Sequence, residues 1–201
     1  MRSTSAKLAL GVTAFALVSL AAPFPGAGVA EAHGYTQEPP SRQAVCAAGN
    51  AGDCGPIQYE PQSAEGPGGF PQAGPPDGQL CSAGKQQFGQ LDDPRGGTWP
   101  AAPVTAGQTV QARWTNTASH PTRDYRYFVT KDGWDPTKPL TREQLEPAPF
   151  AVQDYGGRTP GTTESHPITL PHKKGKQVIV GVWDIADTSN AFYSCSDVDF
   201  H

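Results

Sequence analysis

The sequence of 201 residues carries little charge of either sign and no surplus of positive charge. Charged residues make up 17% of the chain, and 15 Lys and Arg stand against 19 Asp and Glu. Nucleic acids and anionic lipids are bound through clustered positive charge, so this composition gives no electrostatic reason to expect either partner. A neutral or insoluble partner agrees better with it.

Long apolar runs are equally scarce, and the longest lies at the amino terminus. Two basic residues precede a mostly apolar segment, residues 8–22, which is followed by Pro, Gly and small residues ending at Ala32. A membrane-spanning helix needs about 20 apolar residues, whereas a basic start, a shorter apolar core and a small-residue cleavage site are typical of a secretory signal. We therefore expect residues 1–32 to be a signal peptide, and a secreted, extracellular, membrane-free protein of one domain, residues 33–201.

Only four cysteines occur, and no two of them have the Cys-x-x-Cys spacing that is common in zinc sites. In an exported protein, four cysteines favour two disulfides over reactive thiols. Counting alone leaves three connectivities open. Closeness in sequence favours Cys46 with Cys54, which leaves Cys81 to join the first half of the chain to Cys195.

Regular repeats are missing as well, although glycine (23 residues) and proline (21) are abundant. Glycine without a fixed period excludes a collagen-like chain, and so many helix-breaking residues exclude a helix bundle. Residues 33–97 are dense in Gly, Pro, Gln and Ser and show little periodicity. A stretch of this length predicts a large functional or disulfide-stapled loop insertion.

Strand signals begin after residue 100. Alternating or continuous apolar patterns predict strands at residues 109–114, 125–130, 177–183 and 196–200. Thr141 and Gln144 have the spacing of a capping box, which predicts one short helix. These features favour an all-β fold, an immunoglobulin/fibronectin-III-like antiparallel β-sandwich with a large loop insertion and short helical turns.

Cleavage after Ala32 would make His33 the first residue, so that a free α-amine and an imidazole belong to one residue. An α-amine has a pKa of about 7.7–8.0 and can release its proton to a metal near neutral pH. One further imidazole would complete three nitrogens in a T, a set suited to Cu(II) with open positions. Cleavage after Ala30 is also tolerable, and it would abolish this chelate. A histidine at this position can also be a chance occurrence.

The second imidazole has to come from His120, His166, His172 or His201. His120 follows a predicted strand, so a rigid element would present it. The other three lie in polar, loop-like or terminal contexts, and we expect them to be solvated. Because a lone loop histidine is usually a polar surface residue, the histidines alone do not decide for a metal.

Four segments carry a more specific pattern. In chain order they are His33-Gly-Tyr35 with Pro40-Ser-Arg42, Gln58-Tyr-Glu-Pro-Gln-Ser-Ala-Glu65, Ala118-Ser-His120, and Val182-Trp-Asp-Ile-Ala-Asp-Thr-Ser-Asn-Ala-Phe-Tyr193. Over nearly the whole mature chain, these segments resemble the bacterial lytic polysaccharide monooxygenases of auxiliary activity family ten, especially their small chitin-active members.

The resemblance implies a copper enzyme that oxidises the β-1,4-glycosidic bonds of crystalline chitin at C1 and leaves aldonic acid ends. Such an enzyme uses an external electron donor, with O2 or H2O2 as co-substrate. By position, the copper ligands would be the α-amine and Nδ1 of His33 and Nε2 of His120. We expect a monomer that acts on insoluble chitin alongside chitinases.

The resemblance also implies roles for residues around the metal. Phe192 would leave one axial side of the copper without a ligand, and Ala118 would leave room for a small oxidant on the other. Glu65 would steer the oxidant and pass protons. Trp183 would pack below the site, although it could equally be a plain core residue.

A second set of residues would bind the substrate. Tyr59 would offer an aromatic platform for a sugar ring, and polar contacts would come from Glu60, Thr117, Asp187 and Asn190. The disulfide Cys46–Cys54 matches a loop disulfide common in the family, whereas Cys81 and Cys195 occur in only some members.

Other functions remain open at this point. A non-catalytic chitin-binding protein on the same fold would keep Tyr59 but form no oxidised chain ends, and a cellulose-active member would differ in substrate. A secreted copper carrier that handles Cu(I) would offer thioethers, but the only methionine is Met1, which leaves with the signal. A structural or inhibitory sandwich would leave the four segments unexplained.

Overall fold

The computed structural model describes Met1 and residues 32–201. The predicted signal peptide, residues 1–32, therefore lies almost entirely outside the described residues. Residues 32–201 belong to one compact unit. Within the described part of the chain, no helix is long and apolar enough to cross a membrane.

Two β-sheets build this unit, and all neighbouring strands pair antiparallel except one. The smaller sheet has the order β1 (His33–Glu38), β4 (Thr109–Ala118), β7 (Thr163–Thr169). The larger has the order β2 (Glu65–Pro67), β9 (Asn190–Phe200), β8 (Gly175–Ile185), β5 (Thr122–Val129), β6 (Ala151–Asp154), with β3 (Ala102–Val104) parallel to β9. The predicted all-β sandwich is confirmed, and each predicted strand falls on β4, β5, β8 or β9.

The continuous apolar run of β8 follows from burial on both of its faces. Ile179 and Trp183 belong to the core between the two sheets, where they meet residues of β4 such as Trp114. Val180 and Val182 belong to a second core on the opposite face of the larger sheet. A strand buried on both faces has no polar side to show in its sequence.

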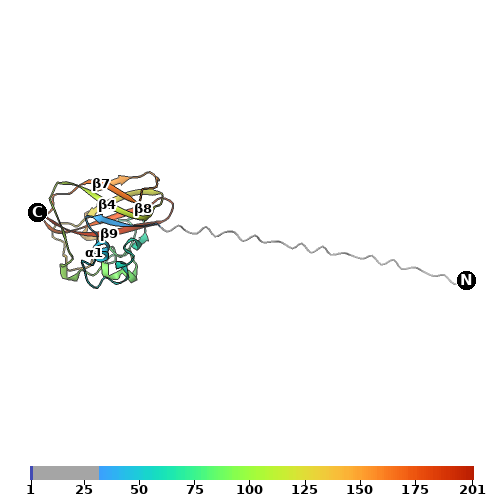
Figure 1. Cartoon of the computed structure of the whole chain (residues 1–201), viewed down its shortest axis with the longest axis horizontal. Coiled ribbons are helices and arrows are strands. Elements are labelled where there is room, and N and C mark those ends of the chain that lie inside the picture. The colour runs from blue at the N-terminus through green and yellow to red at the C-terminus, as the bar shows by residue number, and fades with distance from the viewer. Residues whose placement is uncertain (2–31) are drawn as a thin grey trace. The chain divides into compact units, whose positions relative to one another are not determined.

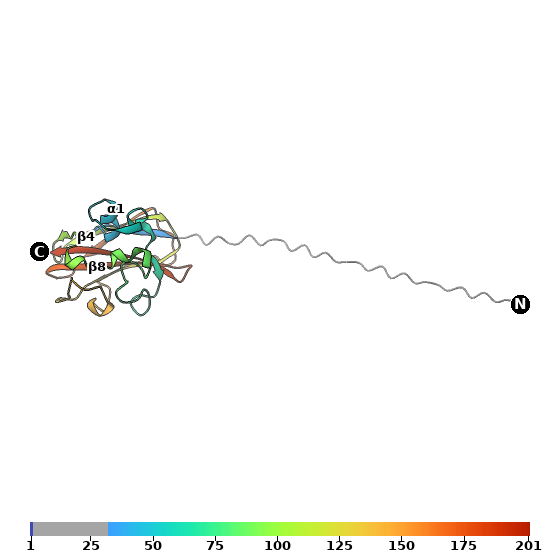
Figure 2. The ribbon, with the colours of Figure 1, turned by 90° about the horizontal axis from the view of Figure 1, so that it is seen from below.

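The second core is covered by the predicted loop insertion. Figure 1 shows α1 (Arg42–Ala47) and the turns after it gathered on one side of the sheets, beside β9, and Figure 2 shows the same unit turned by 90°. The short 3-10 turns of the insertion are η1 (Gly55–Gln58), η2 (Pro61–Ser63), η3 (Gln86–Leu91) and η4 (Arg95–Gly97). The predicted helical turn is η5 (Arg142–Gln144), and its capping box with Thr141 is present.

Two disulfides staple the insertion. Cys46 is bonded to Cys54 within it, and Cys81 is bonded to Cys195 of β9, which is the pairing that closeness in sequence favoured. Both bonds are buried. The predicted staples are therefore present, and one of them joins the insertion directly to the sandwich.

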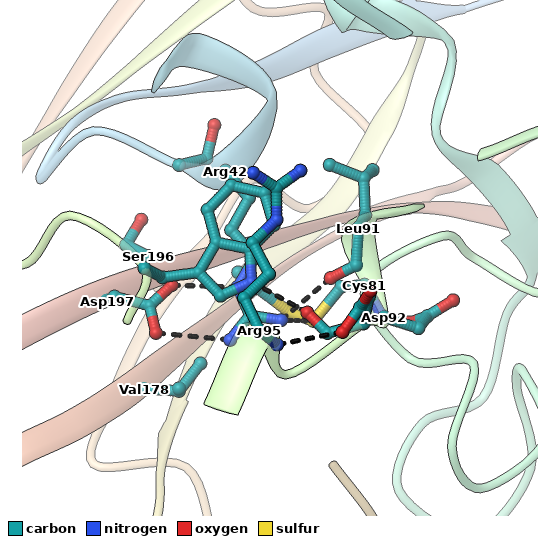
Figure 3. A network of polar contacts seen from close by, with 12 residues as sticks. Arg42, Cys81, Leu91, Asp92, Arg95, Val178, Ser196 and Asp197 are labelled. Atoms are coloured by element: carbon teal, nitrogen blue, oxygen red, sulfur yellow. Dashed lines mark hydrogen bonds and ion pairs between the residues drawn. A yellow bond between two sulfur atoms is a disulfide. The ribbon is translucent and has the colours of Figure 1, made fainter. Parts of the chain in front are cut away.

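A buried ion pair fastens the same junction. Arg42 of α1 is 5% exposed, and its Nε and Nη2 donate to the two carboxylate oxygens of Asp197 on β9 at 2.7 and 3.1 Å. Its Nη1 donates to the carbonyl oxygen of Leu91 at 2.7 Å and lies 3.7 Å from the sulfur of Cys81. Figure 3 shows this cluster from close by. Three donors of one guanidinium thus connect three segments of the chain.

Candidate functional site

His33 and His120 lie at the same end of the smaller sheet. In the antiparallel pair of β1 and β4, His33 lies opposite Ala118, the last residue of β4. His120 follows two residues later, in the short connection to β5. His33 is half-buried and His120 is 8% exposed. The strand register therefore brings the first predicted ligand next to the segment that holds the second.

Phe192 lies beneath this end of the sheets. Its ring is fully buried, and its centroid is 6.4 Å from that of His33 and 5.1 Å from that of Trp183. On β9, Phe192 pairs with Trp183 of β8 on one side and with Glu65 of β2 on the other. The larger sheet thus carries the predicted axial ring and the predicted carboxylate in register.

Glu65 is held by a side chain from the end of β9. Asn190 Nδ2 donates a hydrogen bond to Glu65 Oε1 at 2.7 Å. We predicted Asn190 to be a substrate-binding residue, and the structure brings it onto the carboxylate instead of leaving it alone on the surface. The second N–H and the carbonyl oxygen of the Asn190 side chain are left for other partners, and their contact with a substrate stays a prediction.

The imidazole of His120 has a carboxylate on one side. Its Nδ1 lies 3.4 Å from both Oδ1 and Oδ2 of Asp187, a long contact on a side chain that is itself 46% exposed. A carboxylate beside Nδ1 favours the tautomer with the proton on Nδ1, which leaves the lone pair on Nε2 for a metal. Asp187, another predicted substrate residue, thus also contacts the histidine.

These donors fit a copper ion by their chemistry. Two imidazoles at one end of the sheet, with an α-amine on His33 after processing, are nitrogen ligands that suit Cu(II). The described residues contain no cluster of three or more His, Cys, Asp or Glu side chains that could hold a metal. That absence does not test the predicted ligand set, because only two of its three donors are side chains.

Three further predicted residues, Tyr59, Glu60 and Thr117, lie wholly or partly at the surface. Tyr59 is 85% exposed, the largest exposed fraction of any described aromatic side chain. Glu60 is half-buried and directly precedes η2, which packs against β1 and β4. Thr117 is exposed beside Ala118 at the end of β4. Contacts of these residues with a polysaccharide stay predictions.

The expectation that His166 is solvated was wrong, whereas His172 and His201 are exposed as expected. His166 is 2% exposed on β7. Its Nδ1 lies 2.7 Å from the hydroxyl of Tyr127, and its Nε2 lies 3.1 Å from the hydroxyl of Tyr155. Burial lowers the pKa of His166 to about 4, although the nearby charge of Glu164 opposes this shift.

The hydrogen bonds around His166 run in one direction. Trp114 Nε1 donates to the hydroxyl of Tyr127, and the hydroxyl of Tyr155 donates to Glu164 at 2.5 Å. Because the hydroxyl of Tyr127 already accepts from Trp114, it can donate its own proton to His166 Nδ1. Because the hydroxyl of Tyr155 donates to Glu164, it can accept from His166 Nε2–H. A neutral imidazole satisfies every partner, so His166 is a structural residue of the core and not a second metal ligand.

Sequence reasoning also missed two residues that contact the site's backbone. Thr122, the first residue of β5, donates from Oγ1 to the carbonyl oxygen of His120 at 2.9 Å. Gly34 lies against Trp183, since a Cβ at this position would be 2.7 Å from Cζ3 of the indole. A lone threonine and a lone glycine give no sequence signal for these contacts, which depend on strand packing.

Comparison with known proteins agrees with these features. A family model described as "Lytic polysaccharide mono-oxygenase, cellulose-degrading" matches residues 33–198. The GlcNAc-binding protein A of Shewanella oneidensis is 41% identical over 172 residues, which cover 85% of this chain and 36% of that protein. The chain spans between about a third and about half of the length of the curated relatives it matches.

Solved structures cover the same part of the chain. An AA10 lytic polysaccharide monooxygenase from Streptomyces lividans has a TM-score of 0.82 and 51% identity, with 84% of this chain and 100% of that chain covered. A CBM33 protein from Bacillus amyloliquefaciens in complex with Cu(I) has a TM-score of 0.74 and 37% identity, with 84% and 100% covered. The fold of this chain therefore recurs in these proteins.

Proposed function

The chain belongs to the lytic polysaccharide monooxygenases of auxiliary activity family ten, a copper-dependent family, and from this premise we propose that it cleaves crystalline chitin by oxidation. The proposed reaction breaks β-1,4-glycosidic bonds, attacks C1 and leaves aldonic acid ends. One observation carries the proposal. The register of β1 on β4 puts His33 opposite Ala118, two residues from His120, beside the exposed polar side chains of Thr117 and Asp187.

The copper ligands in this proposal are the α-amine and Nδ1 of His33 and Nε2 of His120. When bound, copper supplies the one-electron chemistry that activates the oxidant, either O2 or H2O2, with electrons from an external donor. Asp187 keeps the His120 ring in the tautomer that frees Nε2. The α-amine exists only after cleavage behind Ala32, so secretion and processing precede activity.

The neighbouring side chains shape the space at the metal. The buried ring of Phe192 has no donor atom, so it excludes water and side-chain ligands from its side. Ala118 offers only a methyl group and leaves room for a small molecule. Glu65 accepts a hydrogen bond from Asn190 at Oε1, which keeps the carboxylate pointed in one direction and leaves Oε2 to hold or move a proton.

A crystalline polymer cannot enter a closed pocket, so its enzyme has to present an open face instead of the concave site common for small ligands. Tyr59 is suited to stack on a sugar ring, and Glu60, Thr117, Asp187 and Asn190 are suited to bind hydroxyl and N-acetyl groups. Support for chitin comes from the Gln58–Glu65 segment and from a relative named for N-acetylglucosamine. The family description names cellulose, so the two polymers have to be compared directly.

We place this activity in a secreted, extracellular protein with a signal peptide over residues 1–32 and a catalytic domain over residues 33–201. Support comes from the amino-terminal pattern and from two buried disulfides, which are typical of exported proteins. The protein acts as a monomer on insoluble chitin, and chitinases then degrade the opened chains.

The deciding experiment compares β-chitin and cellulose as substrates for the copper-loaded protein with ascorbate. Mass spectrometry of the soluble products should show aldonic acids from chitin. Oxidised products from cellulose alone would refute the chitin assignment. Retention on chitin without oxidised products from either polymer would identify a non-catalytic chitin-binding protein.

A matched pair of proteins tests the role of the first residue. One begins at His33, and the other begins at Ala32 and so differs by one alanine. The shorter protein should bind Cu(II) with a three-nitrogen signature in electron paramagnetic resonance (EPR) and form oxidised products. The longer protein should lose both properties, because its α-amine no longer belongs to the histidine. Equal behaviour of the two would contradict the proposed ligand set.

A further inference from the structure

We infer that Thr122 is a positioning residue for the copper site, which it serves by linking the backbone of His120 to the indole of Trp183. The inference rests on the proposed function, because it assumes that His33 and His120 bind the metal together. It concerns the distance between the two histidines, which strand pairing alone does not determine, since His120 lies beyond the end of β4.

The link consists of two consecutive hydrogen bonds through one hydroxyl group. Trp183 Nε1–H donates to Thr122 Oγ1 at 2.7 Å, and the same hydroxyl donates its proton to the carbonyl oxygen of His120 at 2.9 Å. Trp183 and Thr122 are 0% exposed. A buried indole N–H requires a partner, and Thr122 Oγ1 is the acceptor that the structure gives it. The carbonyl of His120 is thereby tied to β8.

The same indole contacts the other histidine's strand. Gly34 follows His33, and a Cβ on Gly34 would lie 2.7 Å from Cζ3 of Trp183. The glycine backbone therefore rests directly on the ring. The ring itself is fixed by stacking on Tyr125, with centroids 5.6 Å apart and an interplanar angle of 6°, and by Phe192. Trp183 is thus a common support for the backbones next to both proposed ligands.

The backbone of Thr122 holds its side chain in place. Its N–H donates to the carbonyl of Arg158, and its carbonyl accepts from the N–H of Gly157. It also pairs with Ile185 of β8, just before a register shift in the β5–β8 ladder. With the backbone tied on several sides and a β-branched side chain, the hydroxyl has little freedom to turn away. Valine at this position would keep the shape and remove only the two hydrogen bonds.

The chain offers a matched control just beyond the far end of β5, the strand that Thr122 begins. Thr130 is also 0% exposed, and its hydroxyl also makes two hydrogen bonds, donating to Gln177 and accepting from the N–H of Val178. Thr130 is eight residues from Thr122, about 26 Å along a strand at 3.3 Å per residue. Thr130→Val therefore removes an equivalent buried hydroxyl far from the proposed site.

The experiment uses the processed protein that begins at His33 and three variants, Thr122→Val, Thr122→Ser and Thr130→Val. Thr122→Val should weaken Cu(II) binding in calorimetry about tenfold, as loss of a group that orients metal ligands does, and should change the EPR spectrum. Thr122→Ser should restore both. Thr130→Val should lower the melting temperature to a similar extent and leave the affinity and the spectrum of the parent unchanged.

A merely structural role for Thr122 would lower the melting temperature without moving the spectrum, and that result would overturn the inference. If Thr122→Val does not fold, Trp183→Phe breaks the same link from its other end, and an unchanged spectrum in that variant overturns the inference too. A parent protein without a three-nitrogen signature would refute the proposed function, and the inference with it. A normal parent with an unaffected Thr122→Val would refute the inference alone.

Discussion

Acidification should destabilise the protein through the buried imidazole of His166. Burial lowers its pKa in the folded protein from 6.5 to about 4, so the unfolded chain binds the proton more readily between these pH values. The free energy of unfolding therefore falls as the pH falls through this window. A difference of 2.5 pH units at 1.36 kcal/mol each gives a loss of about 3 kcal/mol between pH 7 and pH 4. For a domain of this size, such a loss lowers the melting temperature by roughly 6–12 °C.

The hydrogen-bond partners of His166 explain why the folded protein disfavours a second proton on its imidazole. A neutral ring accepts from Tyr127 at Nδ1 and donates to Tyr155 at Nε2. A second proton would oppose Nδ1–H to the hydroxyl proton of Tyr127. Burial raises the pKa of both phenols, which keeps these hydroxyl protons in place.

Urea denaturation of the parent, His166→Gln and His172→Gln at a series of pH values measures this contribution. Other groups titrate as well, so the informative quantity is the difference in slope between variants. His166→Gln should lose the part of the pH dependence between pH 4 and 6.5. The exposed His172 serves as the control, and its variant should follow the parent. Parallel curves for His166→Gln and the parent would refute the assignment.

Three further predictions concern the junction, the surface and the site's support. Arg42→Met should lower the free energy of unfolding by about 3–5 kcal/mol in urea denaturation, because it leaves the carboxylate of Asp197 without its partner. Adding Asp197→Leu to the same chain should recover part of this loss. Tyr59→Ala should change stability by less than about 0.5 kcal/mol, because this side chain is mostly exposed, yet weaken retention in a chitin pull-down. Gly34→Ala should cost about 1–3 kcal/mol in thermal unfolding, because its methyl group would overlap the ring of Trp183.

The sequence predicted those strands whose pattern reflects burial. The run of residues 177–183 is apolar throughout because both faces of β8 are covered, and residues 109–114 alternate because only one face of β4 is. In contrast, β1 carries the residues His-Gly-Tyr-Thr-Gln-Glu, which show neither the apolar run nor the apolar alternation that predicted the other strands. It forms a strand because β4 offers it an edge, and such long-range pairing leaves no local signal.

The candidate site divides in the same way. The sequence alone predicted three candidate site residues, His33, His120 and Glu65, because each belongs to a segment that resembles the family. The burial of His166 could not be seen in Thr-Glu-Ser-His-Pro-Ile-Thr, because its partners Tyr127 and Tyr155 come from elsewhere in the chain. The hydrogen bond from Asn190 to Glu65 likewise depends on β2 pairing with β9.

The disulfides of the insertion affect the proposed binding of a crystalline polymer. Tyr59, Glu60 and Glu65 lie on the stretch between Cys54 and Cys81, and each of these two cysteines is anchored by a disulfide. The surface of a crystalline polymer is rigid, so any conformational adjustment on binding has to occur in the protein, at a cost in conformational entropy. Because disulfides fix both ends of this stretch, it has lost conformational entropy already during folding. Binding to the polymer should therefore cost less entropy.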